Sequence, residues 1–298
     1  MPAACCRPLA TLLACVAGTT LAMADDPHYD VFVTGSAGRL VIGGYDDAAT
    51  TAIVPPDQLR VFGGEVVPSG TSGPYESTSP GEPGFRAATQ AFLDNATLTT
   101  PAGVYSALPA ATPLTFSFLP ISINADTRNL FFWNGTGAVT FAPVAADVAL
   151  DLTKQGGGGW TAGITGASAG VVSGNTIQTT SSGGSAGTVH THLFTSIGKA
   201  GAAPEQGFYL YSLGLQMSGM TDADPLYFVY GAVDPDALTP TQLADFETAH
   251  GSAELWVENN LAAVPEPATL PLAAGLAAAA AVTWRRGGTF AGRRNQTR

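Results

Sequence analysis

Short apolar segments, rich in Val, Phe, Tyr and Thr and broken by Gly and Pro, recur through the middle of the chain. Residues of the first group favour extended strands, and Gly and Pro mark turns between them. Many short strands with long polar connections favour a single β-sandwich or jelly-roll-like domain over a propeller. The pattern predicts an all-β domain with strands at Tyr29 to Thr34, Leu40 to Gly43, Leu59 to Val67, Leu114 to Leu119, Leu130 to Trp133, Ala138 to Phe141, Val189 to Ile197, Gly207 to Met217 and Leu226 to Tyr230.

Two polar segments interrupt this pattern and are predicted to be loops. Residues 68–83 combine Gly, Ser, Thr and Pro, and residues 155–187 are rich in Gly and Ser with little charge. Such a composition buries too little apolar surface to offset the entropy of ordering it. We therefore expect residues 155–187 to form a flexible surface loop.

One helix is predicted after the last strand. Thr239 is a good N-cap residue, Pro240 suits the first helical position, and Gln242 completes a capping box. Gly251 can end the helix, and the amphipathic segment 254–262 then either continues it or stacks on it. We expect a short C-terminal helix that covers one end of the β-domain.

The N-terminus has the pattern of a signal peptide. Arg7 precedes an apolar stretch from Leu9 to Ala17, and Ala22 and Ala24 form the small-x-small pattern of a signal-peptidase site. These features predict that residues 1–24 are removed during export. An alternative is a lipoprotein signal with Cys15 as the acylated residue, although the apolar region before that cysteine is very short.

The C-terminus has three consecutive parts: Pro265-Glu266-Pro267, an apolar run from Ala268 to Trp284, and an arginine-rich end. The apolar run is near the minimum length for a transmembrane helix, and the arginines favour retention of this end in the cytoplasm. This order resembles the PEP-CTERM sorting signal, which an exosortase recognises during export. The resemblance implies a sorting signal at residues 264–298 and an exported protein at the cell surface or in the extracellular matrix, transiently or stably membrane-anchored.

The composition of the remaining β-rich surface domain, residues 25–263, limits its chemistry. All three cysteines, Cys5, Cys6 and Cys15, lie in the predicted signal peptide, so thiol chemistry, disulfides and cysteine-based zinc sites are excluded. The domain retains six basic and 22 acidic residues, a net charge of −16. It therefore disfavours nucleic acid and suits cations, neutral surface polysaccharides or proteins as partners, besides signal peptidase and exosortase during export.

Two histidines near residue 190 are the strongest chemical signal. On a strand, His190 and His192 share a face with Cα atoms about 6.5 Å apart, a spacing that allows both imidazoles to bind one metal. His28 and Asp30 form a second pair of potential ligands two residues apart. If the pairs meet, three histidines and a carboxylate make a ligand set for zinc or another divalent transition metal.

Other interpretations of these residues stay open. The histidines can belong to the solvent-exposed face of an ordinary strand, and Asp30 can be a turn residue. Asp224, just before a predicted strand, can supply a further carboxylate, although an Asp-Pro turn is the simpler interpretation.

A series of short motifs resembles a family of exported PEP-CTERM proteins, some cyanobacterial members of which are repressed by the zinc-uptake regulator. The resemblance implies a role in zinc capture or storage outside the cytoplasm. Glu82 stands where this family is expected to have Asp before Pro-Gly-Phe. The motifs are His28-Tyr29-Asp30-Val31, Gly38-Arg39-Leu40-Val41-Ile42-Gly43-Gly44, Glu82-Pro83-Gly84-Phe85, His190-Thr191-His192, Gly207-Phe208-Tyr209-Leu210 and Asp224-Pro225-Leu226-Tyr227-Phe228-Val229.

These features favour a non-catalytic metal-binding surface protein, and two other functions remain. One is an adhesin or glycan-binding β-sandwich, in which exposed Trp133, Trp160 and Tyr211 stack on sugars. The other is a cupin-like metalloenzyme, since His-x-His pairs on β-strands also hold catalytic metals. The chain has no His-Glu-x-x-His motif, which disfavours the enzyme.

Overall fold

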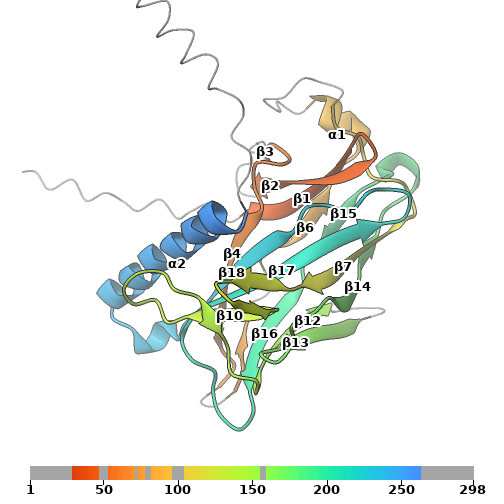
Figure 1. Ribbon diagram of the computed structural model, residues 1–298. Coiled ribbons are helices and arrows are strands. Elements are labelled where there is room, and N and C mark those ends of the chain that lie inside the picture. The colour runs from red at the N-terminus through yellow and green to blue at the C-terminus, as the bar shows by residue number, and fades with distance from the viewer. Residues whose placement is uncertain are drawn as a thin grey trace, which may run out of the picture.

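The computed structural model describes residues 29–46, 53–70, 73–77, 82–95, 104–154 and 159–262. These ranges are mainly β-strands, as predicted, with a helix at their C-terminal end (Figure 1). In the described ranges, no helix has both the length and the apolar character that a bilayer span requires. Three groups of predicted residues lie outside the described residues: Ala22 and Ala24 of the signal peptide, His28, and the sorting signal with Pro265, Glu266 and Pro267.

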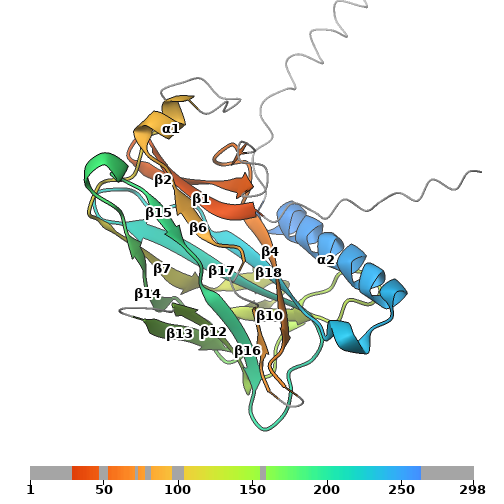
Figure 2. The ribbon, with the colours of Figure 1, turned by 180° about the vertical axis from the view of Figure 1, so that it is seen from behind.

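Five of the described strands form a small sheet in the order β15, β6, β1, β2 and β3 (Figure 2). Their bounds are Tyr29–Ser36 for β1, Arg39–Asp46 for β2, Ile53–Val54 for β3, Phe85–Ala87 for β6 and Val189–Thr191 for β15. β1 pairs antiparallel with β2 along its whole length. β6 runs parallel to β1 and antiparallel to β15, so it joins two segments that lie far apart in sequence.

A larger, curled sheet has eleven strands within the described residues. Its main path is β11, β10, β17, β18, β4, β5, β16, β12 and β13, and β7 and β14 branch from β17. β8 and β9 form a separate hairpin of Ile121–Ile123 and Asp126–Arg128. The eleven strands are Val61–Pro68 (β4), Tyr75–Glu76 (β5), Pro113–Leu119 (β7), Leu130–Trp133 (β10), Ala142–Pro143 (β11), Val148–Lys154 (β12), Trp160–Thr165 (β13), Val172–Thr179 (β14), Phe194–Lys199 (β16), Gly207–Met217 (β17) and Leu226–Ala232 (β18).

The main hydrophobic core joins the two sheets. Val31 and Val33 of β1 and Phe85 of β6 belong to the same buried cluster as Phe116 of β7 and Phe228 of β18. Apolar residues at alternate positions of a strand lie on one face, and removing that face from water is the main stabilising contribution to such a core. The small sheet is therefore held in place by its inner face.

The outer face of the small sheet carries a separate small cluster. Phe32 faces away from Val31 and packs with Tyr45 of β2 and Leu93 of α1, which spans Gln90–Asn95. Asp30 lies two residues before Phe32 on β1 and therefore shares its face. This places Asp30 on the outer face, beside the small aromatic cluster.

The C-terminal helix α2 spans Pro240–Asn260 and confirms the predicted start of the helix. The Thr239 hydroxyl accepts the backbone N–H of Gln242, and the Gln242 side chain accepts the backbone N–H of Thr239. The helix continues through Gly251, so the segment after this glycine extends it. α2 lies alongside β4 and β18 (Figure 1, Figure 2). Two short 3₁₀ turns, Gly183–Ser185 and Pro235–Ala237, complete the described helices.

Several predicted boundaries are wrong. Residues 138–141 are not a strand, and only the short β11 follows them. The predicted flexible loop at residues 155–187 contains β13 and β14, and β5 lies within the predicted loop at residues 68–83. These segments form strands because their backbones pair with β12, β7 and β4, despite their Gly- and Ser-rich composition. β12 itself was not predicted.

Candidate metal centre

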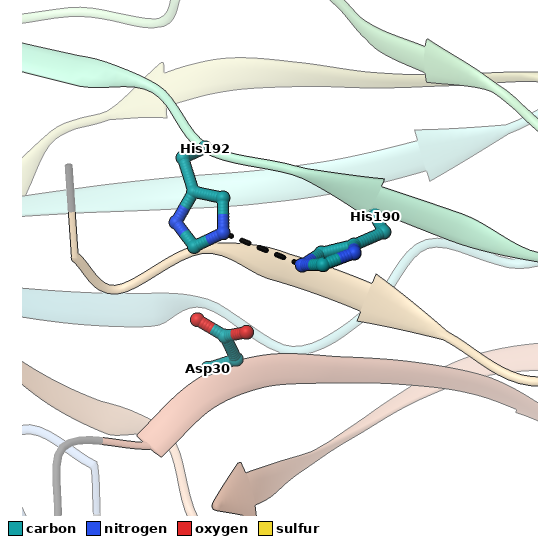
Figure 3. Close-up of side chains that lie close together, drawn as sticks. All are labelled: Asp30, His190 and His192. Carbon is teal, nitrogen blue, oxygen red and sulfur yellow. Dashed lines mark hydrogen bonds between the residues drawn. The ribbon is translucent and has the colours of Figure 1, made fainter. Parts of the chain in front are cut away.

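Three of the predicted ligands come together at the edge of the small sheet. One ligand atom from each of Asp30, His190 and His192 lies within 4.8 Å of the others (Figure 3). Asp30 is on β1, His190 is on β15, and His192 follows β15. The fold thus brings together Asp30 and His190, which are 160 positions apart in sequence. The predicted fourth ligand, His28, lies outside the described residues.

β6 places Asp30 and His190 on the same outer face. Arg86 of β6 is in register with Phe32 of β1 on one side and with His190 of β15 on the other. Residues in register across neighbouring strands project to the same face. Because Asp30 shares the face of Phe32, its carboxylate and the His190 imidazole project from the same side of the sheet.

His192 is positioned by a change of direction in the chain. The strand predicted from Val189 to Ile197 is interrupted at His192 and Leu193, where the chain passes from the small sheet into β16 of the large sheet. The sequence predicted that His190 and His192 share one uninterrupted strand, and this prediction is wrong. Their rings nevertheless meet, with the two Nε2 atoms 3.4 Å apart.

This separation suits a shared metal ion. Two nitrogens bound tetrahedrally to zinc at 2.0–2.1 Å lie about 3.3 Å from one another. The Nε2 atoms of His190 and His192 are already 3.4 Å apart without a metal. Without a metal, one ring must donate an N–H hydrogen bond to the other, because two acceptor nitrogens cannot form a hydrogen bond with each other. A shared metal ion would take the place of this hydrogen bond.

Gly84 brings the backbone of the neighbouring segment against the cluster. Its N–H donates to Asp30 Oδ1 at 2.6 Å, in a buried position. A Cβ atom at residue 84 would lie 2.7 Å from Asp30 Oδ1 and 2.7 Å from His192 Nδ1. Real Cβ atoms essentially never approach so closely, so this position requires glycine for the observed geometry.

A buried tyrosine makes a hydrogen bond to the segment that carries Gly84. The Tyr230 hydroxyl donates to the backbone oxygen of Glu82 at 2.8 Å. Burial raises the pKa of Tyr230 to about 12, so the hydroxyl keeps its proton at neutral pH and remains a donor. Tyr230 and Asp30 thus restrain the two ends of the Glu82–Gly84 segment.

The cluster is closed on one side and open on the other. Asp30 is 5% exposed, His192 is half-buried, and His190 is exposed. If these three residues bound a metal, the exposed edge would leave a coordination position for water, for an exchangeable ligand or for a further side chain. The Arg86 guanidinium, which shares this face, lies 4.0 Å above the ring of Tyr45.

Asp224 is not part of the cluster. Its carboxylate lies 2.5 Å from the Arg39 guanidinium and 3.7 Å from that of Arg60. This ion pair stands beside the end of the small sheet, where Arg39 begins β2. Asp224 lies in the irregular segment before β18 and pairs with these arginines instead of joining the candidate ligands.

The aromatic residues proposed for sugar stacking do not form an exposed surface. Trp133 is 5% exposed and Tyr211 is 1% exposed. Trp160 is half-buried, and its Nε1–H donates to the backbone oxygen of Thr176 at 2.9 Å. Their expected exposure is wrong because Trp133 packs on Phe208 and Tyr211 belongs to the main core.

The candidate ligands could be found from sequence, whereas Gly84 was missed as a member of the site. The motif Glu82-Pro83-Gly84-Phe85 was the only signal for it. A glycine immediately before a buried strand residue often marks a close approach of another group to the backbone. Without the fold, nothing identified Asp30 and His192 as the groups that approach it.

Comparison with known proteins places residues 263–286 in the PEP-CTERM protein-sorting motif. The chain therefore carries the signal of an exported, exosortase-sorted protein, as the sequence predicted. No curated protein matches this chain, and no solved structure does. The resemblance to the zinc-regulated family receives no support from these comparisons and remains a prediction.

Proposed function

We propose that this exported protein binds a divalent transition metal, most naturally zinc, through Asp30, His190 and His192 on a β-sandwich-like domain. The main support is the 3.4 Å separation of the two histidine Nε2 atoms beside a buried carboxylate. Two imidazoles and a carboxylate form a ligand set found in zinc proteins. His28, two residues before Asp30, is proposed as a fourth ligand.

The proposed role is metal capture or storage at the cell surface, without catalysis. Three features support it: the sorting motif at residues 263–286, the net charge of −16 over residues 25–263, and the exposed side of the site at His190. An acidic surface attracts cations from solution, and an open edge lets them reach the ligands. Anchoring in the membrane and association with the extracellular matrix belong to this proposal.

Two alternatives receive less support. A glycan-binding adhesin was based on exposed aromatics, and two of the three are buried in the core. A cupin-like metalloenzyme would use the same three ligands with the open position as a reaction site. The capture role is preferred because it requires only the cluster itself.

Metal binding is tested with the full chain, purified without a polyhistidine tag. Zinc content and affinity are compared for the native protein, His190→Ala/His192→Ala and the control Thr191→Ala, which keeps both histidines. We expect the native protein and the control to bind zinc at this site and the double variant to lose that zinc. Equal zinc binding by the native protein and the double variant would contradict the proposal.

A further inference from the structure

A second group of potential ligands lies where the C-terminal helix contacts the large sheet. Glu65 of β4 and Glu247 and His250 of α2 each offer a ligand atom within 4.8 Å of the others. Both ribbon views show α2 alongside β4 and β18, on a different part of the domain from β1 and β15 (Figure 1, Figure 2). This cluster shares no residue with the first.

The sequence places these side chains on facing surfaces. Glu247 and His250 are three residues apart, so they lie on the same face of the helix. Glu65 shares one face of β4 with Gly63, two residues earlier. A Cβ atom at Gly63 would overlap Glu254 Oε1 and lie 3.4 Å from His250 Cε1, so the face of β4 that carries Glu65 is the face that meets α2.

His250 is buried, and two contacts restrain its ring. It is 6% exposed, and its ring stacks on Phe208 with centroids 5.3 Å apart. Its Nε2 lies 2.9 Å from the backbone oxygen of Val229, which can only accept, so Nε2 carries the proton and donates. In the neutral ring, Nδ1 is then the nitrogen with a lone pair, and histidines that bind metals typically donate their other ring N–H to a backbone oxygen in this way.

The charges around His250 favour a cation. Besides Glu65 and Glu247, the Glu254 carboxylate lies 3.7 Å from His250 Nε2. A divalent ion at this position would be attracted by all three carboxylates. Glutamate and histidine at positions i and i+3 of a helix are also a known metal-binding arrangement.

We propose that Glu65, Glu247 and His250 form a second divalent-metal site that fastens α2 to β4. Mixed carboxylate and imidazole ligands fit zinc or a similar transition ion. The ion would bridge the sheet and the last helix before the sorting motif, so its binding stabilises the docked position of α2. This site stands independently of the proposed function of Asp30, His190 and His192.

The test uses Zn²⁺ alone as the probe and the full chain carrying His190→Ala/His192→Ala, which removes the first site. Into this background we introduce Glu65→Gln/Glu247→Gln, two changes that preserve side-chain size. The matched control is Glu76→Gln/Asp245→Asn, which removes the same charge from exposed positions on β5 and α2. Bound zinc is measured after dialysis, and amide hydrogen exchange of α2 is measured with and without Zn²⁺.

We expect the background and the control to bind one zinc ion and the Glu65→Gln/Glu247→Gln variant to bind at least about tenfold more weakly. Zinc should slow amide exchange in α2 only where the two glutamates are present. Zinc affinity unchanged by Glu65→Gln/Glu247→Gln, or no zinc in the background, overturns the second site. Failure of the first site has a different signature, because the native protein would then bind no more zinc than the His190→Ala/His192→Ala background.

Discussion

Gly84 donates its backbone N–H to the Asp30 carboxylate at 2.6 Å, across the parallel pairing that joins β6 to β1. A backbone N–H orients a carboxylate more firmly than a flexible side-chain donor does, because the backbone donor loses no rotamer freedom when the hydrogen bond forms. A side chain at position 84 would also collide with the His192 ring. One residue without a side chain thus sets the approach of two proposed ligands from different segments.

Replacement of Gly84 by alanine tests this positioning. The new methyl group would lie 2.7 Å from both Asp30 Oδ1 and His192 Nδ1, so at least one ligand must move. We expect Gly84→Ala to weaken zinc binding by at least about tenfold, as loss of a ligand-orienting contact does. The measurement is competition for Zn²⁺ with a chromophoric chelator. Gly170→Ala is the control, since its Cβ would meet nothing within 4 Å, and equal affinities for the two variants would count against the positioning role.

Asp30→Asn removes the charge of one proposed ligand and preserves its shape. The amide oxygen can still accept from the Gly84 N–H, so the local fold should persist. We expect zinc affinity to fall by about ten- to a hundredfold, with a much smaller change in the thermal midpoint of the metal-free protein. Isothermal titration and thermal unfolding provide the two measurements. Asp126→Asn, on the exposed β9 strand, controls for net charge and should bind zinc like the native protein.

Stability should decrease at high pH because of Tyr230. Burial raises its pKa from 10.0 to about 12, so the folded protein holds this proton more tightly than the unfolded chain does. The contribution is complete below pH 10 and is lost as the pH rises from 10 to about 12, with a total of roughly 3 kcal/mol. Urea unfolding across this pH range measures the loss.

Tyr230→Phe separates this titration from the hydrogen bond. The variant should lose about 1–3 kcal/mol of unfolding free energy at neutral pH, because the Glu82 oxygen loses its buried donor. Its stability should then decrease less steeply above pH 10 than that of the native protein. Buried Tyr211 also has a pKa well above 10, so part of the alkaline decrease remains. A Tyr230→Phe variant with an unchanged pH profile would show that Tyr230 does not titrate in this way.

Thr239→Ala should destabilise the start of α2. The substitution removes the hydroxyl that accepts the Gln242 N–H, and the loss of such an N-cap typically costs about 1 kcal/mol. Chemical unfolding of the variant measures the cost. Thr241→Ala, one position inside the helix, preserves the capping box and should change stability by less than half as much. A cost that is the same for both variants would indicate that the cap contributes little.

The sequence predicted best those elements whose signals are local. β10 and β17 have the bounds expected from their apolar runs, and the capping residues located the start of α2. The Gly- and Ser-rich composition of β13 and β14 predicts a loop, and pairing with β12 and β7 overrides it. In β12, Val148, Leu150 and Leu152 alternate with partly exposed residues, which is the pattern of a half-buried strand.

The candidate site was predicted only in part, because its geometry depends on pairing across long sequence distances. The His190 and His192 spacing and the nearby Asp30 identified potential ligands. That Asp30 reaches them follows from β6 lying between β1 and β15, and no local pattern predicts this order. The Glu247 and His250 spacing was likewise visible in the sequence, but its partner Glu65 could be assigned only from the docking of α2 on β4.

The end of α2 limits how far the folded domain can stand from its sorting motif. Ala262 is 2% exposed, and only Ala263 and Val264 separate it from Pro265. The matched sorting motif begins at residue 263, directly after this buried residue. The folded domain and the sorting motif are therefore contiguous in sequence, and an exosortase that engages the motif acts on a chain whose preceding residue is packed into the domain.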